Sequence, residues 1–382
     1  MQIQTRLPKV GTTIFTVMSQ LAVQHGAINM GQGFPDFDAP GFLLDGFERA
    51  MRSGKNQYAM ATGIAPLRQA IAAKTEAMYG RAIDADTDVT VTSGASEAIL
   101  DAVMALVHPG EEVIVLDPCY DCYEPAIHMA GADAVHVPLD PDSFAVDWDR
   151  VRDAITSKTR MLFINSPHNP SGAVLGEADM ATLAELVRGT RIIILSDEVY
   201  EHIIYDDARH ESVLRHPELA ERSVVVSSFG KTYHCTGWKV GYAVAPAALS
   251  AEIRKVHQYN TFCTMQPAQW AFAEAIEQHA DHHLGLGAFY QPKRDRFREL
   301  LGQTKLRALP VPGGYFQLAD YSAVSDLDDL AFARWLTIEH GVTGVPLSPF
   351  YETAPEGQRL IRLCFAKDEA TMVAATERLA RL

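Results

Sequence analysis

The sequence predicts an α/β protein in which helices cover both faces of a mostly parallel sheet, with a second, smaller α+β domain. The first observation is a series of short, fully apolar runs that alternate with helical patterns from about residue 88 onward. Strands that are apolar at every position are typical of parallel sheets buried on both sides. The second observation is a change after about residue 281, where charged helical segments alternate with short strand-like pieces.

The elements of the sheet follow in chain order. DVTVT (88–92) predicts a strand, the apolar spacing from Ile99 to Val107 predicts a helix, and EVIVL (112–116) predicts the next strand, which together indicate a βαβ unit. Met180 to Val187 traces one apolar face of a later helix. Further strands are predicted at MLFIN (161–165), IIIL (192–195), SVVVSS (223–228) and VGYAVA (240–245).

The second part of the chain predicts its own helices and strands. QPKRDRFRELL (291–301) and DDLAFARWLTIEH (328–340) have helical, charged patterns. GYFQLAD (314–320) and LIRLCFA (360–366) are typical of strands. These pieces predict a small α+β domain.

Composition excludes several classes of protein. Lys plus Arg number 33 against 48 Asp plus Glu, which gives a formal charge of −15, and no long basic run occurs. Nucleic acid and anionic membrane surfaces are therefore poor candidates for partners. The 382 residues, 47% of them apolar, provide for a large core and for more than a minimal binding module.

Targeting and cysteine signals predict a cytoplasmic protein. The first twenty residues contain no uninterrupted apolar stretch of the kind found in signal peptides, and the strongest apolar run, Ile192 to Leu195, is too short to span a bilayer. An odd number of cysteines in a chain this long is not a disulfide framework, and reduced thiols are typical of the cytoplasm. The cysteines are Cys119, Cys122, Cys235, Cys263 and Cys364.

Polar, chemically reactive stretches follow five of the predicted strands. Ligands of parallel sheets bind beyond the carboxyl ends of the strands. We therefore expect these five strand ends to converge on one site. The stretches are TSGASE, DPCYDCYEP, NSPHNPSG, SDEVYEH and SSFGKTYHCTGWK.

Three other motifs are weaker evidence of a function. GKT (230–232) lacks the preceding glycine that a P-loop needs, and GQG (31–33) has neither the context nor the spacing of a dinucleotide fingerprint. Cys119 and Cys122 have the spacing of a redox pair or of half a zinc site. No second close pair of cysteines exists, so we interpret this spacing as coincidental and expect no metal.

Two residues in these stretches have chemistry of their own. A lysine at the position of Lys231 is usually a surface charge. Lys231, however, follows a strand that is predicted to be buried, and it precedes Lys239 by eight residues. A partly desolvated lysine beside another cation has a lowered pKa and a nucleophilic amine suited to forming a Schiff base. Asp197 follows the IIIL strand after one serine, at a position where a carboxylate is either structurally paired or the partner of a protonated pyridine nitrogen.

Several separated motifs together resemble a known family. SDEVYEH, NSPHNPSG and SSFGKTYHCTGWKVGY, with GQGFPDF near the start and LIRLCFAKDEAT near the finish, are similar in order and spacing to the pyridoxal phosphate enzymes of aminotransferase class I, fold type I. The resemblance covers the chain almost from end to end. Within the family the sequence looks most like methionine aminotransferase, and somewhat less like kynurenine aminotransferase/glutamine transaminase K.

The resemblance implies roles around the ring of pyridoxal 5′-phosphate. Lys231 matches the lysine that forms the Schiff base and then shuttles the substrate's proton. Asp197 matches the partner of the pyridine nitrogen. The other matches are Asn169 and Tyr200 at the phenolic oxygen, and Tyr120 and Val199 on the two faces of the ring.

The resemblance also places the cofactor's phosphate. Gly94, Ala95 and Ser96 lie where a strand turns into a helix, so free backbone N–H groups and the helix dipole would face the dianion. Ser228 and Lys239 match a hydroxyl and a cationic ligand of the phosphate, although many relatives have Arg at the second position.

For the substrate, the resemblance selects Arg362 in IRLCFA, which matches the arginine that binds the α-carboxylate and would otherwise pass for a surface residue. Asn169 and Gly33 lie on the substrate side in relatives. Phe15 aligns with an aromatic residue that lines the side-chain pocket. An aromatic pocket without a second evident arginine favours methionine or aromatic side chains over aspartate.

Two matches imply a homodimer with shared active sites. Tyr58, in NQYAMATG, matches a tyrosine that reaches the phosphate across the dimer interface. Phe262, in HQYNTFCTMQ, matches a residue that enters the neighbouring subunit's pocket. The implied domains are an N-terminal segment (1–40) that packs with the small domain, a large cofactor-binding domain (41–280) and a small C-terminal domain (281–382).

We therefore expect a cytoplasmic, homodimeric transaminase that works by a ping-pong mechanism through a Lys231 Schiff base. Methionine is the favoured amino donor, aromatic amino acids, histidine and glutamine are plausible donors, and a 2-oxo acid is the acceptor. One alternative on the same scaffold is β-elimination from cysteine S-conjugates. An alternative of another class is a non-catalytic ligand-binding regulator.

Overall fold

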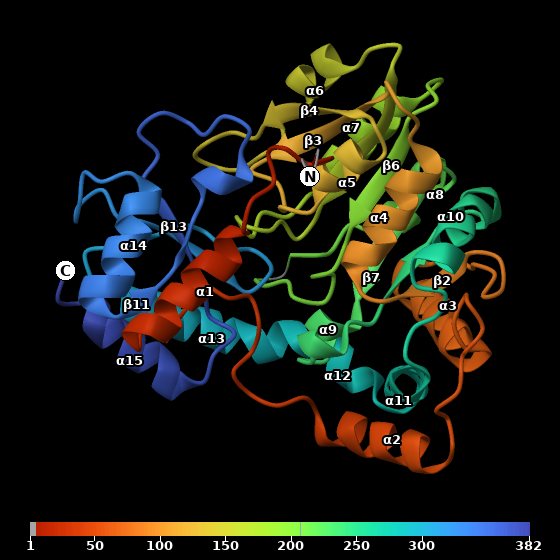
Figure 1. The fold of residues 1–382 in the computed structure, drawn as a ribbon, viewed down its shortest axis with the longest axis horizontal. Coiled ribbons are helices and arrows are strands. Elements are labelled where there is room, and N and C mark those ends of the chain that lie inside the picture. The colour runs from red at the N-terminus through yellow and green to blue at the C-terminus, as the bar shows by residue number, and fades with distance from the viewer. Residues whose placement is uncertain (1–4, 207) are drawn as a thin grey trace, which may run out of the picture.

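A seven-stranded sheet lies at the centre of the larger part of the molecule in this computed structural model, which describes residues 5–206 and 208–382 (Figure 1). Residues 1–4 of the predicted N-terminal segment and residue 207 of the predicted large domain lie outside the described residues. All neighbouring strands are parallel except where β8 is involved, which confirms the predicted sheet. The strand order is β2 (Val89–Thr92), β8 (Gly241–Val244), β7 (Ser223–Ser228), β6 (Ile193–Asp197), β5 (Thr159–Asn165), β3 (Glu112–Asp117) and β4 (Asp133–Pro138).

Burial explains which of these strands the sequence predicted. β3, β5, β6 and β7 are buried at nearly every position, so each presents apolar side chains to both faces of the sheet. β4 was not predicted, because its sequence DAVHVP mixes polar and apolar residues. It lies at the edge of the sheet, where most of its side chains are partly or fully exposed.

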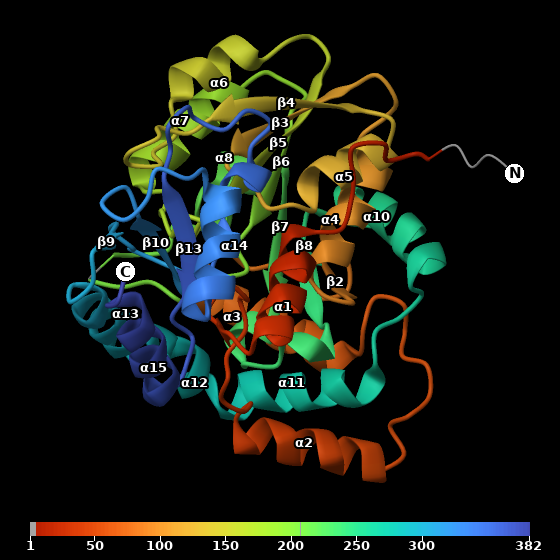
Figure 2. The same ribbon diagram turned by 60° about the vertical axis from the view of Figure 1, so that its left-hand side comes forward.

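Helices cover both faces of the sheet, as the sequence predicted (Figure 2). Because alternate residues of a strand point to opposite faces, Ile193 and Leu195 of β6 belong to one core and Ile194 to another. The first core includes α4 (Ala95–Leu106), α5 (Tyr123–Met129) and α10 (Ala247–Asn260). The second includes α2 (Gly41–Arg52), α3 (Ala65–Tyr79), α6 (Trp148–Ala154), α7 (Glu177–Val187), α8 (Pro217–Ala220) and α11 (Gln266–Gln278).

The predicted β–α–β segment is present as β2, α4 and β3, but its two strands are not neighbours. β8, β7, β6 and β5 lie between them in the sheet. Periodicity predicts the helix that joins the two strands, whereas their positions depend on pairing with strands that come much later in the chain.

The second sheet has four antiparallel strands: β12 (Val345–Pro346), β13 (Leu360–Cys364), β10 (Phe316–Asp320) and β9 (Arg307–Ala308). It shares a core with α13 (Leu286–Leu301), α14 (Asp329–His340) and α15 (Glu369–Leu379). β1 (Ile28–Asn29) pairs in parallel with β11 (Val342–Thr343). α1 (Ile14–His25) contacts α14, and Figure 2 shows the two helices side by side. The beginning of the chain is thus built into the structure that its end forms.

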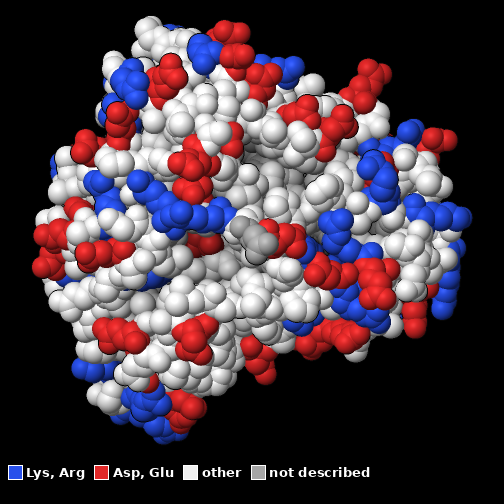
Figure 3. Space-filling view, turned by 180° about the vertical axis from the view of Figure 1, so that it is seen from behind, with Lys and Arg blue, Asp and Glu red and all other residues white. Residues whose placement is uncertain are grey.

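The surface carries charges of both signs. On the face shown in Figure 3, the acidic and basic side chains are interspersed around a hollow lined mainly by uncharged residues. Within the parts of the chain that the structure describes, no helix is both long enough and apolar enough to cross a membrane.

Candidate active site

A cavity of about 270 Å³ opens at the carboxyl ends of β2, β3, β5, β6 and β7. The five polar stretches therefore converge on one site, as the sequence predicted. The N-terminal segment and the second sheet close the cavity on the other side. The predicted site residues that line it are Phe15, Gly33, Gly94, Ala95, Ser96, Tyr120, Asn169, Asp197, Val199, Tyr200, Ser228, Lys231, Lys239 and Arg362.

Lys231 projects into this cavity from α9 (Phe229–Thr232), the short helix that follows β7. Its Nζ donates a hydrogen bond of 3.3 Å to the carbonyl oxygen of Gly33. Burial lowers the pKa of the Lys231 amine to about 8, and the positive charges of Arg362 and Lys239 act in the same direction. A larger fraction of this amine is thus neutral than at an ordinary lysine.

Asp197 lies at the end of β6 with a buried side chain. Its Oδ2 accepts a 2.6 Å hydrogen bond from the hydroxyl of Tyr123, and its Oδ1 accepts one of 3.2 Å from the backbone N–H of Val199. Burial nevertheless raises the pKa of the carboxyl group to about 6. The side chain that contacts Asp197 directly, Tyr123, is uncharged, so it does not neutralise the carboxylate. A buried carboxylate without a charged partner is suited to binding a cationic ligand.

The N-terminus of α4 forms a cradle for an anion. Gly94 precedes the helix with φ +83°, and within the described parts of the chain no side chain caps the free N–H groups of the first turn. A Cβ atom at Gly94 would lie 3.2 Å from Nζ of Lys239, so the glycine lets this ammonium group approach the helix end. Ser228 adds a hydroxyl to the same cavity. Backbone N–H groups, a hydroxyl and an ammonium suit a phosphate.

Arg362 lies on β13 and is almost fully buried. One terminal nitrogen donates a 2.7 Å hydrogen bond to Oδ1 of Asn169, and the other donates one of 2.9 Å to the carbonyl oxygen of Gly31. The guanidinium stacks 3.9 Å from the ring centre of Phe316, while its buried Nε has no hydrogen-bond partner among the residues that the structure describes. A buried guanidinium with a free donor is suited to binding a carboxylate.

Gly33 is needed where the N-terminal segment crosses the cavity. A Cβ atom there would lie 2.6 Å from Cζ of Phe316, which is closer than packing permits. The carbonyl oxygen of Gly33 also accepts a 2.7 Å hydrogen bond from the hydroxyl of Tyr315. This contact holds the acceptor of the Lys231 amine in place.

Sequence reasoning missed several residues of the site. Tyr123 follows Tyr120 by three residues in DPCYDCYEP, and nothing in that motif distinguishes the tyrosine that supports Asp197. Phe316 belongs to the predicted strand GYFQLAD, where an aromatic residue is typical of core packing. The role of Tyr123 depends on the packing of α5 beside the end of β6, and that of Phe316 depends on β10 lying against the cavity.

Tyr58 and Phe262 do not line the cavity of a single chain. Tyr58 is 82% exposed and Phe262 is 43% exposed. Their rings pack edge to face with centroids 5.3 Å apart. The two residues that the resemblance assigned to a neighbouring subunit thus lie together on the surface.

Comparison with known proteins identifies the family. The family model "Aminotransferase class I and II" matches residues 26–379. The chain belongs to this family. It is a fold type I, pyridoxal phosphate-dependent aminotransferase whose substrates are an amino acid and a 2-oxo acid, as the sequence predicted.

Individual relatives match over nearly their whole length. The methionine aminotransferase of Escherichia coli K12 is 53% identical, with 99% of this chain and 98% of the relative covered. A probable N-succinyldiaminopimelate aminotransferase of Mycobacterium tuberculosis is 41% identical over the same shares. The crystal structure of E. coli YbdL, identified as a methionine aminotransferase, superposes with a TM-score of 0.97, at 53% identity and with both chains fully covered.

The geometry of the cavity fits pyridoxal phosphate. A buried carboxylate at Asp197 suits the protonated ring nitrogen, and the N-terminus of α4 with Lys239 suits the phosphate. The amine of Lys231 and the guanidinium of Arg362 line the same cavity as these two groups. The chain therefore has a fitting partner for each charged group of the cofactor and for the substrate's carboxylate.

Proposed function

We propose that this aminotransferase uses methionine as its favoured amino donor, with aromatic amino acids, histidine and glutamine as further donors. The observation that carries this proposal is a buried arginine beside aromatic rings. Arg362 is the only arginine among the described residues that line the cavity, and Phe15 and Phe316 flank it. One guanidinium serves the α-carboxylate, so the rest of the site favours an uncharged side chain. The 53% identical methionine aminotransferase of E. coli supports the same preference.

The site residues would divide the binding of the cofactor among them. Bound pyridoxal phosphate supplies an electron-accepting ring that stabilises negative charge at the substrate's Cα. Asp197 would keep the ring nitrogen protonated, and Tyr120 and Val199 would flank the ring. Asn169 and Tyr200 would donate hydrogen bonds to the phenolic oxygen. The phosphate would be held by Gly94, Ala95, Ser96, Ser228 and Lys239.

Lys231 would hold and move the proton. Its Nζ, once released by the incoming amino acid, accepts the proton from the substrate's Cα. The lowered pKa of about 8 leaves part of the population neutral, as a base must be. Arg362 orients the substrate through its carboxylate, and the carbonyl oxygen of Gly33, 3.3 Å from Nζ, keeps the amine facing the cavity.

The active enzyme is, in this proposal, a homodimer. Tyr58 and Phe262 pack against each other on the surface, and three apolar residues within three positions of one of them in the chain are exposed as well: Met60, Tyr259 and Met265. A large exposed apolar patch is typical of an interface. Tyr58 would reach the phosphate of the neighbouring subunit, and Phe262 would reach its substrate pocket.

The proposed domain division is a cofactor-binding domain of residues 41–280 and a small domain of residues 281–382, with an N-terminal segment, residues 1–40, that packs with the small domain. The parallel pairing of β1 with β11 and the contact between α1 and α14 support the last point. We also propose a cytoplasmic location, which the five free cysteines support.

The test is a half-reaction with a panel of amino acids, followed by the absorbance change of the bound cofactor. We expect methionine to convert the enzyme fastest and aspartate to convert it slowly. Faster conversion by aspartate would contradict the proposed preference. Measuring pyruvate and ammonia from a cysteine S-conjugate in parallel separates elimination from transamination.

A further inference from the structure

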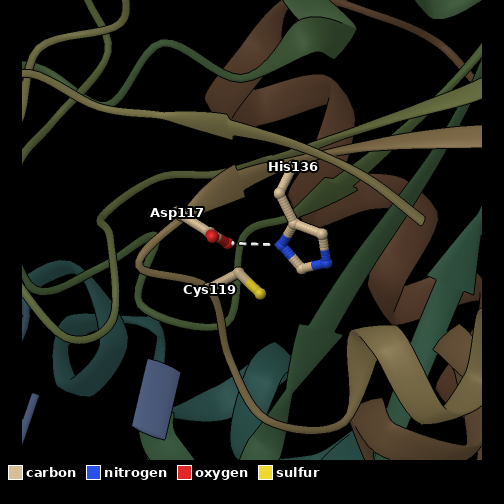
Figure 4. Close-up of side chains that lie close together, drawn as sticks. All are labelled: Asp117, Cys119 and His136. Carbon is tan, nitrogen blue, oxygen red and sulfur yellow. Dashed lines mark hydrogen bonds and ion pairs between the residues drawn. The ribbon is translucent and has the colours of Figure 1, made fainter. Parts of the chain in front are cut away.

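A carboxylate, a thiol and an imidazole meet on the flank of the first sheet, outside the cavity described above. Asp117, Cys119 and His136 each offer one possible ligand atom, and the three atoms lie within 4.8 Å of one another (Figure 4). Asp117 and Cys119 are buried, and His136 is partly buried. Nδ1 of His136 lies 2.8 Å from Oδ1 of Asp117. Nothing in the proposed transamination uses these side chains.

Two paired strands and the loop that follows one of them bring the three side chains together. Asp117 ends β3, and His136 lies on the parallel neighbour β4, opposite Val115. Cys119 lies in the loop that continues from β3, and its backbone N–H donates a 2.7 Å hydrogen bond to the carbonyl oxygen of Phe350. Sites built on such elements hold their ligands more accurately than sites on free loops.

The donor set is that of a zinc-type ion. Thiolate, imidazole and carboxylate are the three protein donors that Zn²⁺ uses, and three of them leave a fourth position for water. A ring nitrogen of His136 also lies within 4.8 Å of carboxylate oxygens of Glu124 and Glu352. Carboxylates beside a ligating histidine orient the ring and strengthen its binding.

We propose that Asp117, Cys119 and His136 bind a divalent zinc-type ion. As the metal–sulfur bond forms, the thiol of Cys119 releases its proton to solvent. Nδ1 of His136 gives up its hydrogen bond with Asp117, releases its proton to solvent and ligates through its lone pair, while Nε2 keeps the other ring proton or takes one up from solvent. No electron is transferred. Cys122 takes no part, so the ligands are not the C-x-x-C pair of Cys119 and Cys122.

The position of this site gives the ion a structural role. The loop from Asp117 continues through Cys119 to Tyr120, which lines the active-site cavity. The backbone N–H of Glu352 donates a 2.9 Å hydrogen bond to Oδ2 of Asp117. An ion here would tie β3 and β4 to the segment around residues 350–352 and would stabilise this junction.

The experiment measures Zn²⁺ binding to the purified holoenzyme by competition with a chromophoric chelator, and Co²⁺ binding by its d–d absorbance at wavelengths longer than those of the cofactor. We expect one ion per chain. Cys119→Ser and His136→Gln should each weaken binding about tenfold or more, since even outer partners of metal ligands contribute that much. The matched controls Cys122→Ser and His128→Gln should bind as the unaltered enzyme does.

The results of these measurements either support or overturn the proposed metal site. An unaltered holoenzyme that binds no Zn²⁺, or controls that weaken binding as much as the ligand variants, would overturn it and leave Asp117, Cys119 and His136 as a hydrogen-bonded cluster only. Circular dichroism and the cofactor absorbance show whether each variant folds. If a variant fails to fold, ¹¹³Cd NMR of the unaltered enzyme replaces it, because a shift without thiolate character contradicts the assignment.

Discussion

Lys231 and Asp197 lie in one cavity with pKa values shifted in opposite directions by the same cause. Burial lowers the pKa of the lysine to about 8 and raises that of the aspartic acid to about 6. In both residues burial disfavours the charged form. The protonated ring of bound pyridoxal phosphate would lower the pKa of Asp197 again, because an opposite charge stabilises the carboxylate.

The first prediction concerns Lys231 in the enzyme stripped of its cofactor. The rate at which pyridoxal phosphate is captured should rise with pH up to about 8 and then level off, since only the neutral amine is a nucleophile. Stopped-flow absorbance measures this rate. Lys231→Ala, the control, should form no borohydride-stable adduct at any pH. A rate that stays constant between pH 6 and pH 9 would be incompatible with the lowered pKa.

The second prediction separates Asp197 from its supporting tyrosine. Asp197→Asn keeps the shape of the side chain but removes its charge, so turnover should fall about tenfold to a hundredfold, because a hydrogen bond to a charged group contributes about 1.5–3 kcal/mol. Tyr123→Phe removes only the 2.6 Å hydrogen bond to Oδ2 and should have a smaller effect. Steady-state kinetics measure both, and a larger loss in Tyr123→Phe would contradict this ranking.

At the scale of elements, one buried histidine connects α4 with α10. Nδ1 of His257 lies 2.8 Å from Oε1 of Glu97 and 3.5 Å from Oδ2 of Asp101, and its Nε2 lies 2.7 Å from the carbonyl oxygen of Ala61. Burial alone would lower the pKa of His257, but hydrogen bonds that the ring donates to these carboxylates outweigh burial and raise the pKa to about 10. The imidazolium thus links the helix that begins at the anion cradle with the segment that follows Tyr58.

The third prediction follows from this shift. A pKa raised in the folded protein stabilises it fully below the ordinary pKa of histidine, and this stabilisation is lost as pH rises through about 10. His257→Gln should therefore lower the free energy of unfolding by about 3 kcal/mol at pH 6, as removal of one partner of a buried ion pair does. The difference should shrink toward pH 10. Denaturant unfolding measures it, with the exposed His25→Gln as control; a difference independent of pH would contradict this role.

Comparing individual elements shows which strands and which site residues the sequence predicts. Buried strands such as β6 can be predicted because they appear in the sequence as apolar runs. The polar stretches that follow these runs indicate the site that holds Lys231 and Asp197. β4 has no such run because it lies at an edge. His136 on β4 and Asp117 on β3 are neighbours only through strand pairing, so no local pattern connects them.

At the scale of the whole molecule, the fourth prediction tests the dimer. Met60→Arg places a charge in the exposed apolar area around Tyr58 and Phe262 and should shift the protein toward monomers. Activity should then fall at low protein concentration, because each site would lack the residues of its neighbour. Sedimentation velocity and activity at several concentrations measure this. Ile338→Arg, an exposed apolar position on α14, serves as control, and an unchanged dimer in Met60→Arg would exclude this interface.

The hydrogen bond between Arg362 and Gly31 joins residues 331 positions apart in the chain. During synthesis on the ribosome, the residues that line the cavity from the first sheet emerge well before the guanidinium does. A nascent chain that stops short of β13 contains Lys231 and Asp197 but has no arginine for the α-carboxylate. Within one chain, the group that binds the substrate's carboxylate is therefore synthesised after the residues that bind the cofactor.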